Sequence, residues 1–182
     1  MVVAGLLLGG WMISAGVSKT VSEYQVKAVF LYNFTKFVNW PADADSSIKA
    51  SFVIGIVGED PFRAILENTV GEERVQDHPI VIQRFRSDET VTNCNILFIA
   101  RSEKDRVKAV LEQVKGRAIL TVADTPQAAE QGVMINLSLV EGSVKMEINQ
   151  TAVESAGLQI SAKVLSLARI VSSTNDKPAS KP

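Results

Sequence analysis

Apolar residues recur along the chain with two different spacings. Nearly continuous apolar runs at Ser51–Val57, Ile80–Phe85, Asn95–Ala100 and Ala118–Val122 are typical of strands buried on both faces of a sheet. Between residues 107 and 114, apolar positions instead repeat at helical spacing. Strands that alternate with helices predict an α/β fold, with a single domain whose mixed, mainly parallel sheet is flanked by helices.

The first predicted helix carries most of the aromatic residues. A capping-box pattern at Thr20–Glu23 opens a helix that should end near Asn39. Its apolar surface is wider than one sheet face usually covers, so the helix is either sandwiched between elements or meets another protein chain. Three of its aromatic residues are candidates for self-association as a homodimer: Tyr24, Phe34 and Phe37.

Three further positions predict helix starts. Asp60, followed by Pro61, is placed to cap a helix over 62–68. Ser102 precedes the amphipathic segment and is predicted to cap it. Asp124 follows an apolar run and is predicted to cap a short helix.

The C-terminal part predicts a β-hairpin and a helix. Strands over 133–140 and 143–148 are separated by Glu141-Gly142, a two-residue turn of the kind that joins hairpin strands. A short helix capped by Asn149 or Thr151 should follow, and a final helix should run from Ser161 to Val171.

The two ends of the chain differ from the rest. Residues 1–16 are apolar and uncharged, which is typical of a signal peptide and too short to span a bilayer. A buried N-terminal helix is the alternative. Signal peptides normally begin with a positively charged region, and its lack here indicates that the true start lies upstream of Met1. We therefore predict a cleaved leader, an exported domain over 17–171, and a disordered polar tail over 172–182.

Composition excludes several functional classes. The 19 Lys and Arg residues against 20 Asp and Glu residues give a net charge of −1, which offers no basic stripe for nucleic acid. A single Cys and a single His exclude an intrachain disulfide framework, thiolate zinc sites and most histidine-based catalysis. We expect no metal and no cofactor.

The search for catalytic motifs yields no reactive set. Glu59 and Asp60 resemble the metal-binding acids of receiver domains, but no acceptor Asp ends the strand at residues 98–101. Gly55 and Gly58 do not form a dinucleotide-binding run, and His78 is interpreted as a turn residue. No nucleophile, base and orienting group can be assembled, so the sequence favours a protein that is not an enzyme.

A ligand-binding protein is the rival interpretation. Open α/β sheets carry a crevice at the carboxyl ends of their strands. In this sequence the crevice would lie near Gly58, Glu59, Arg101 and Asp124, with Arg101 available to an anionic ligand. A small-ligand sensor in the same compartment therefore remains an alternative.

Several stretches together resemble one family. They occur in order along the chain: 27–41 (KAVFLYNFTKFVNWP), 55–62 (GIVGEDPF), 94–99 (CNILFI), 120–124 (LTVAD), 132–135 (GVMI), 144–149 (VKMEIN) and 156–168 (AGLQISAKVLSLA). This ordered set resembles the YfiR-like family of exported bacterial proteins. The position of the usual double glycine is Gln131-Gly132 here.

The resemblance implies a periplasmic regulator without catalytic activity. A protein of this family binds the periplasmic sensor domain of an inner-membrane diguanylate cyclase and represses the enzyme, which lowers cyclic di-GMP and biofilm formation. An outer-membrane lipoprotein is the second implied partner, because in the family it sequesters the regulator.

Cys94 matches one cysteine of the family. Members that pair cysteines use disulfides for folding and redox response, but this chain has no partner thiol. An intermolecular disulfide and an ordinary buried apolar residue both remain open for Cys94.

The predicted contact surface lies at the end of the hairpin. Glu147 alternates with Met146 and Ile148 and should lie on the solvent face of its strand, free to contact the sensor domain. Val153, on the next helix, is predicted as its apolar neighbour. The competing interpretations are an exposed charge on an edge strand for Glu147 and an ordinary core residue for Val153.

Overall fold

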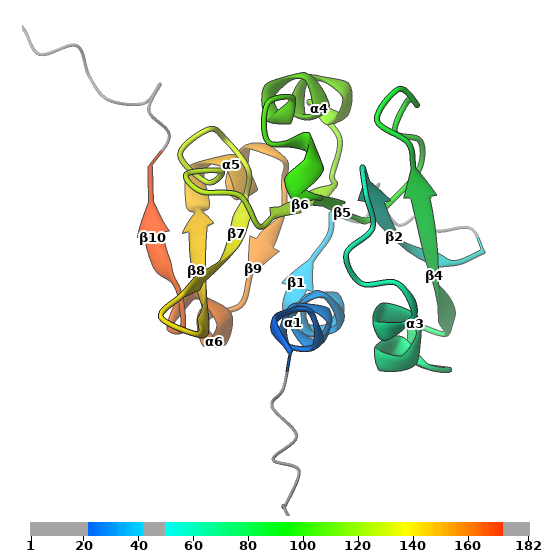
Figure 1. The fold of residues 1–182 in the computed structure, drawn as a ribbon. Helices are drawn as coiled ribbons and strands as arrows, with labels where there is room; N and C mark the ends of the chain where they lie inside the picture. The colour runs from blue at the N-terminus through cyan, green and yellow to red at the C-terminus, as the bar shows by residue number, and fades with distance from the viewer. Residues whose placement is uncertain (1–21, 42–49, 173–182) are drawn as a thin grey trace, which may run out of the picture.

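A mixed sheet of eight strands lies at the centre of the molecule (Figure 1), in the order β10-β8-β7-β6-β5-β2-β4-β3. The structure is a computed structural model that describes residues 22–41 and 50–172. In sheet order the strands are β10 (Arg169–Val171), β8 (Ser143–Asn149), β7 (Ile135–Val140), β6 (Leu120–Ala123), β5 (Ile96–Ile99), β2 (Phe52–Val57), β4 (His78–Phe85) and β3 (Arg74–Val75).

Most neighbouring strands in this sheet are parallel. The run β4, β2, β5, β6 and β7 is parallel throughout, and β10 is parallel to β8. Only the β7–β8 and β3–β4 pairs are antiparallel. The predicted α/β fold with a mixed, mainly parallel sheet is therefore confirmed.

Helices cover both faces of the sheet (Figure 1). On one face α1 (Glu23–Phe37) and α3 (Ala64–Val70) pack on a core cluster that includes Ile54 and Phe98. On the other face α4 (Val107–Val114) packs on a second cluster. Alternate residues of each central strand supply the two clusters, which explains why these strands are apolar without interruption.

The helix α1 starts later and ends earlier than predicted. Its capping box joins Ser22 and Gln25, because the Ser22 hydroxyl accepts from the Gln25 amide and the Gln25 side chain accepts from the Ser22 amide. The predicted cap, Thr20, lies outside the described residues. At the other end β1 (Val38–Asn39) leaves the helix to pair with β9 (Gln159–Ile160).

Two other predicted helix caps are wrong. The Asp60 carboxylate accepts from the Phe62 amide and closes a turn, while α3 itself starts at Ala64. Ser102 lies in η1 (Arg101–Glu103), a separate 3₁₀ turn that precedes α4. The Asp60 contact is a local hydrogen bond that sequence spacing does not distinguish from a cap, whereas the Ser102 hydroxyl accepts from the distant Glu59 amide.

The C-terminal hairpin is confirmed and the final helix is shorter than predicted. Glu141 and Gly142 both have positive φ, 49° and 74°, as a two-residue hairpin turn of this kind requires. Asn149 caps α5 (Gln150–Ser155) by accepting from the Ala152 amide. The last helix, α6, covers only Ala162–Leu165, because a turn at residues 166–168 leads into β10, which pairs with β8.

A second hairpin joins β3 and β4 and was not predicted. Gln76 and Asp77 form its turn with φ values of 47° and 66°, and His78 begins β4 instead of lying in the turn.

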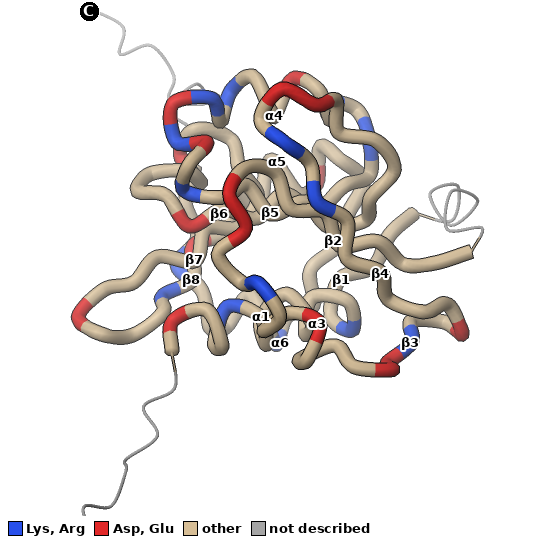
Figure 2. Tube along the Cα trace, turned by 45° about the vertical axis from the view of Figure 1, so that its right-hand side comes forward, with Lys and Arg blue, Asp and Glu red and all other residues tan. Residues whose placement is uncertain are grey.

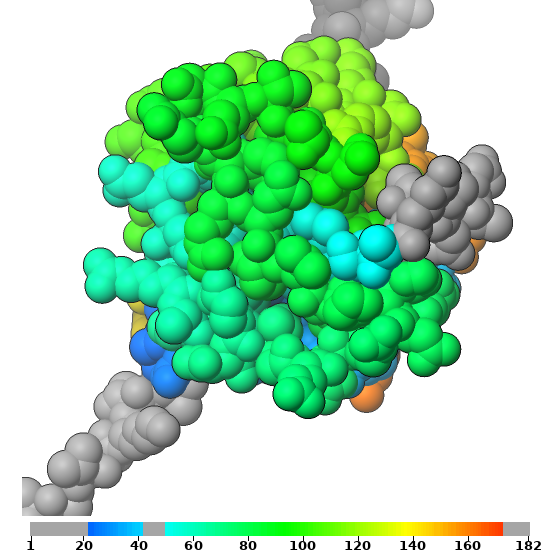
Figure 3. All heavy atoms as spheres, turned by 90° about the vertical axis from the view of Figure 1, so that its right-hand side faces the viewer, coloured from blue at the N-terminus to red at the C-terminus, as the bar shows by residue number. Residues whose placement is uncertain are grey.

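Seen from the β4 edge, the surface is built mainly from the cyan and green middle of the chain (Figure 3).

Charges of both signs are interspersed along the described trace (Figure 2). Among the described residues no helix is long and apolar enough to cross a membrane. The predicted leader over 1–16 and almost all of the predicted tail over 172–182 lie outside the described residues.

Candidate functional site

The carboxyl ends of β5 and β6, where a ligand crevice was predicted, are filled by charged side chains of the chain itself. The Lys27 ammonium, from α1, lies 2.9 Å from the Asp124 carboxylate, and both side chains are fully buried. Lys27 also pairs with Glu23 one turn earlier in the helix. Asp124 is thus an ion-pair partner of α1, and the prediction that it caps a helix is wrong because turns follow it.

Two more side chains complete this cluster, which we call the α1 anchor (Glu23, Tyr24, Lys27, Arg101 and Asp124). The Tyr24 hydroxyl donates to Asp124 at 2.9 Å. Burial, together with this hydrogen bond and the Asp124 charge, raises the pKa of Tyr24. Arg101 donates to the Asp124 carbonyl oxygen at 3.2 Å and lies 3.5 Å from Glu23. Arg101 is therefore engaged by its own chain at the place where an anionic ligand was considered.

The neighbouring end of β2 is closed as well. Gly58 follows β2 with φ of 93°, and the side chains of Ser102 and Glu103 lie against it. The Ser102 hydroxyl accepts from the Glu59 amide at 2.9 Å, and Glu103 is buried. The crevice that α/β sheets often use for ligands is occupied here by η1 and the α1 anchor.

Glu147 does not lie free on its strand. Its carboxylate pairs with Arg169 of β10 and accepts from the Asn136 side-chain amide of β7 at 3.1 Å. The three residues are direct cross-strand neighbours, so their side chains share one face of the sheet. Burial alone would raise the pKa of Glu147, but the hydrogen bonds from Arg169 and Asn136 and the Arg169 charge lower it overall.

This pairing makes part of the stability depend on pH. The pKa of Glu147 is lower in the folded protein than in the unfolded chain, where a glutamate has a pKa of about 4.3. The ionised carboxylate therefore stabilises the fold fully above that pH, and the contribution is lost as the pH falls through the folded-state pKa. We expect Arg169→Gln to lower the urea midpoint at pH 7 and to have little effect near pH 2. Arg86→Gln, which removes an exposed pair with Asp88, is the control and should show no such pH dependence. An equal loss at both pH values would contradict the role of the pair.

An apolar surface surrounds the Glu147–Arg169 pair. A recess of about 300 Å³ is lined by Ser138, Val140, Lys145, Met146, Glu147, Leu167 and Arg169. Leu167 is 70% exposed, and Val140 is also exposed. On the opposite face of the same strands Leu139 and Ile170 are exposed too. We call the side chains of Val140, Glu147, Leu167 and Arg169 the hairpin surface.

Val153 lies apart from this surface. It is 2% exposed and belongs to the core cluster beneath α1. It lines a different recess, of about 270 Å³, with Ile148, Leu158 and residues around them. In this structure Val153 is a core residue, so it does not adjoin Glu147 on the surface as its predicted partner role requires.

The three aromatic candidates for self-association are all engaged within the chain. Phe34 is buried, the Tyr24 ring packs edge-on against Phe62 at 5.4 Å, and the Lys163 ammonium lies 5.0 Å from the centre of the Phe37 ring. The helix α1 is thus covered by α3, by β8 and by the C-terminal segment. Self-association through these residues stays a prediction.

Cys94 is buried just ahead of β5. Burial raises the pKa of its thiol to about 12, although the charge of Arg117 opposes the shift. Thiol–disulfide exchange requires the thiolate, so this environment supports the interpretation of Cys94 as a small apolar core residue. Within the described ranges no group of three or more His, Cys, Asp and Glu side chains is placed to hold a metal ion.

Sequence reasoning missed Lys27 and Arg169. Both belong to charged pairs whose partners are distant in the sequence, at positions 124 and 147. The one available signal for Lys27 was its position on the apolar side of an amphipathic helix, directly before Ala28 and one turn before Leu31. No comparable signal marks Arg169, because it depends on the register of β10 against β8.

Comparison with known proteins bears on the fold and on the family. A solved structure of an ABC domain in complex with L-Trp from Streptococcus pneumonia is similar in fold, with a TM-score of 0.51 and 13% sequence identity. The match covers 69% of this chain and 58% of that one, so the likeness concerns the fold alone. No curated protein matches the sequence. The YfiR/HmsC-like family model matches residues 24–169, which is most of the chain, and the protein therefore belongs to the YfiR/HmsC-like family.

Proposed function

We propose that this protein is a periplasmic regulator that binds the periplasmic sensor domain of an inner-membrane diguanylate cyclase and holds the enzyme inactive. Membership of the YfiR/HmsC-like family supports this function. An outer-membrane lipoprotein that competes for the regulator is part of the same proposal. The regulator would act by binding, with no bond made or broken.

The hairpin surface is the observation that carries the proposal. Leu167 and Val140 expose apolar side chains beside the Glu147–Arg169 pair. Apolar anchors next to an arginine whose charge is held in place form the kind of surface that protein partners recognise. Arg169 is the exposed member of the pair, at 65%, and Glu147 is largely covered, at 17%. The partner would therefore meet Leu167 and Arg169 first, with Glu147 acting to orient Arg169.

Repression of this kind needs only a modest differential affinity. If the active and inactive forms of the cyclase are equally populated, a preference of about 2.7 kcal/mol for the inactive form holds about 99% of it off. One interface of ordinary size with a few well-packed anchors supplies that energy.

We expect Leu167→Asp to weaken repression without unfolding the protein. A charged side chain at an exposed anchor should weaken sensor-domain binding at least about tenfold, or about 1.4 kcal/mol. Stability should change by no more than about 0.5 kcal/mol because the side chain is exposed. The measurement is cyclic di-GMP in a deletion strain complemented with the wild type or the variant.

The matched control is Val29→Asp, which places the same charge at an exposed valine of α1, away from the hairpin surface. It should restore low cyclic di-GMP as the wild type does. If Leu167→Asp also restores it, the hairpin surface is not the contact. If deletion of the gene leaves cyclic di-GMP unchanged, the proposed function itself is wrong.

A further inference from the structure

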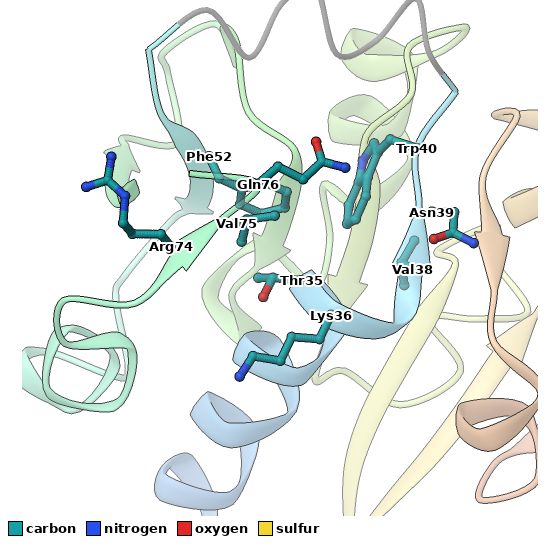
Figure 4. Close-up of a pocket in the computed structure, with 9 residues that line it drawn as sticks. All are labelled: Thr35, Lys36, Val38, Asn39, Trp40, Phe52, Arg74, Val75 and Gln76. Carbon is teal, nitrogen blue, oxygen red and sulfur yellow. The ribbon is translucent and has the colours of Figure 1, made fainter. Parts of the chain in front are cut away.

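The recess of about 300 Å³ at the hairpin surface, which we call the hairpin recess, differs from the cavity of about 400 Å³ at the amino end of β2 (Figure 4). The lining of that cavity is mainly polar, and its lysine, Lys36, is engaged by the Tyr32 ring and by Glu73. The lining of the hairpin recess is mainly apolar, and it includes a lysine, Lys145. The hairpin recess therefore combines apolar surface with a charge whose partners need to be found.

The apolar part of the hairpin recess is open to solvent. Leu167, in the turn that precedes β10, is 70% exposed, and Val140, at the end of β7, is 44% exposed. Met146, which is buried, also lines the recess. An apolar side chain inserted here would cover Leu167 and Val140, and burial of such exposed anchors is what stabilises protein interfaces.

Lys145 has no counter-ion among the residues that the structure describes. It is exposed and forms no ion pair or hydrogen bond within residues 22–41 and 50–172. The anion two residues along β8, Glu147, is engaged elsewhere, because its Oε1 accepts from Arg169 and its Oε2 accepts from Asn136. The charge of Glu130 also acts on Arg169.

The charged side chains that line the recess thus leave one positive charge uncompensated. They are Lys145, Arg169 and Glu147, and the last two form a pair. An exposed lysine near a sheet edge can serve only to prevent aggregation. The position of Lys145 beside the exposed Leu167 gives it a second use, because a partner that covers the apolar surface also lowers the local dielectric around the ammonium and favours an anion next to it.

We propose that the hairpin recess receives an apolar side chain of the cyclase sensor domain and that an acidic residue flanking this side chain pairs with Lys145. This inference rests on the proposed function and specifies the chemistry of the partner segment. The apolar side chain would contact Leu167 and Val140. A basic segment would be repelled by Lys145, and a segment without charge would leave the ammonium buried without a counter-ion.

Two substitutions of Lys145 test the charge. Each variant is produced at graded levels in the deletion strain, and the amount of regulator that lowers cyclic di-GMP by half is measured. Lys145→Gln should raise this amount about threefold, the effect of one partly exposed ion pair. Lys145→Glu should raise it at least about tenfold, because like charges then face each other. The unfolding temperature of both purified variants should stay unchanged, since Lys145 is exposed and unpaired.

The matched control is Lys108→Glu, which makes the same change of charge at an exposed lysine of α4 outside the recess. It should repress as the wild type does. If Lys145→Glu also represses as the wild type does while Leu167→Asp fails, the acidic contact is overturned and the proposed function stands. If deletion of the gene leaves cyclic di-GMP unchanged, both are wrong.

Suppressors of Lys145→Glu identify the occupant of the recess. Selection for restored repression should yield changes in the sensor domain of a cyclase that replace an Asp or Glu by a neutral or basic residue. The same changes should weaken repression by the wild-type regulator. Suppressors that map outside a cyclase sensor domain overturn the assignment of the partner. A purified wild type that sediments as a dimer, and that Lys145→Glu makes monomeric, also overturns it, because the occupant is then a second copy of this chain.

Discussion

Replacement of Lys27 by methionine should lower the free energy of unfolding by about 3–5 kcal/mol, because removal of one partner of a buried ion pair leaves the other charge uncompensated. In this variant Asp124 still accepts a hydrogen bond from the Tyr24 hydroxyl and lies 3.7 Å from the Arg101 guanidinium. Its side chain is fully buried. Methionine has a similar length and introduces no strain, so the loss reports the charge. Urea unfolding followed by circular dichroism measures it.

The double variant Lys27→Met/Asp124→Asn separates the ion pair from packing. With both charges removed, the buried carboxylate no longer has to be compensated, and we expect at least half of the lost stability to return. Lys115→Met, at an exposed lysine that pairs with Glu112, should change stability by no more than about 0.5 kcal/mol. A cost at Lys27 as small as at Lys115 would show that the α1 anchor does not hold the helix.

Substitution of Gly58 by alanine should cost about 3 kcal/mol, from backbone strain at positive φ and from collision. A Cβ atom at this position would lie 2.4 Å from the Ser102 hydroxyl and 2.8 Å from the Glu103 Cγ. To relieve the collision, η1 must shift, and the hydrogen bond between Glu59 and Ser102 is then lost. The unfolding free energy measures the sum of these costs.

Gly71→Ala is the control for backbone strain alone. Gly71 also has positive φ, 52°, but no atom lies within 4 Å of the added Cβ. With φ 52° and ψ −131° it lies outside the left-handed helical region, and its expected cost is about 1–2 kcal/mol. The difference in unfolding free energy between the two variants measures how tightly Ser102 and Glu103 pack against Gly58. Equal costs at the two glycines would contradict this packing.

The fold could be predicted because its signals are local. Strands buried on both faces, such as β2 and β5, are apolar at every position, and the Glu141-Gly142 turn carries its conformation in two residues. The end of the chain was predicted less well. Residues 169–171 are compatible with a helix, and only the free edge of β8 selects a strand, a choice that depends on tertiary contact.

The candidate sites could be predicted only in part. Glu147 was predicted to lie free on the solvent face of its strand, but its side chain is only 17% exposed and pairs with Arg169, a contact that depends on strand register. Asp124 was interpreted as a cap because an acid after a strand often caps a helix, whereas its real partner, Lys27, lies 97 residues away. Charge pairs of this separation leave no periodic pattern in the sequence, so they become visible only in the folded molecule.

The small β1–β9 ribbon sets an order of events for folding. Val38 pairs with Ile160, and the Phe37 carbonyl oxygen accepts from the Ser161 amide, so the end of α1 is secured by a strand that emerges 122 residues later. A chain released from the ribosome or a translocation channel in N-to-C order must therefore leave this aromatic helix incompletely covered until almost the whole domain is available. Contacts of such long range slow folding, and chaperones that shield apolar segments would act on α1 during that interval.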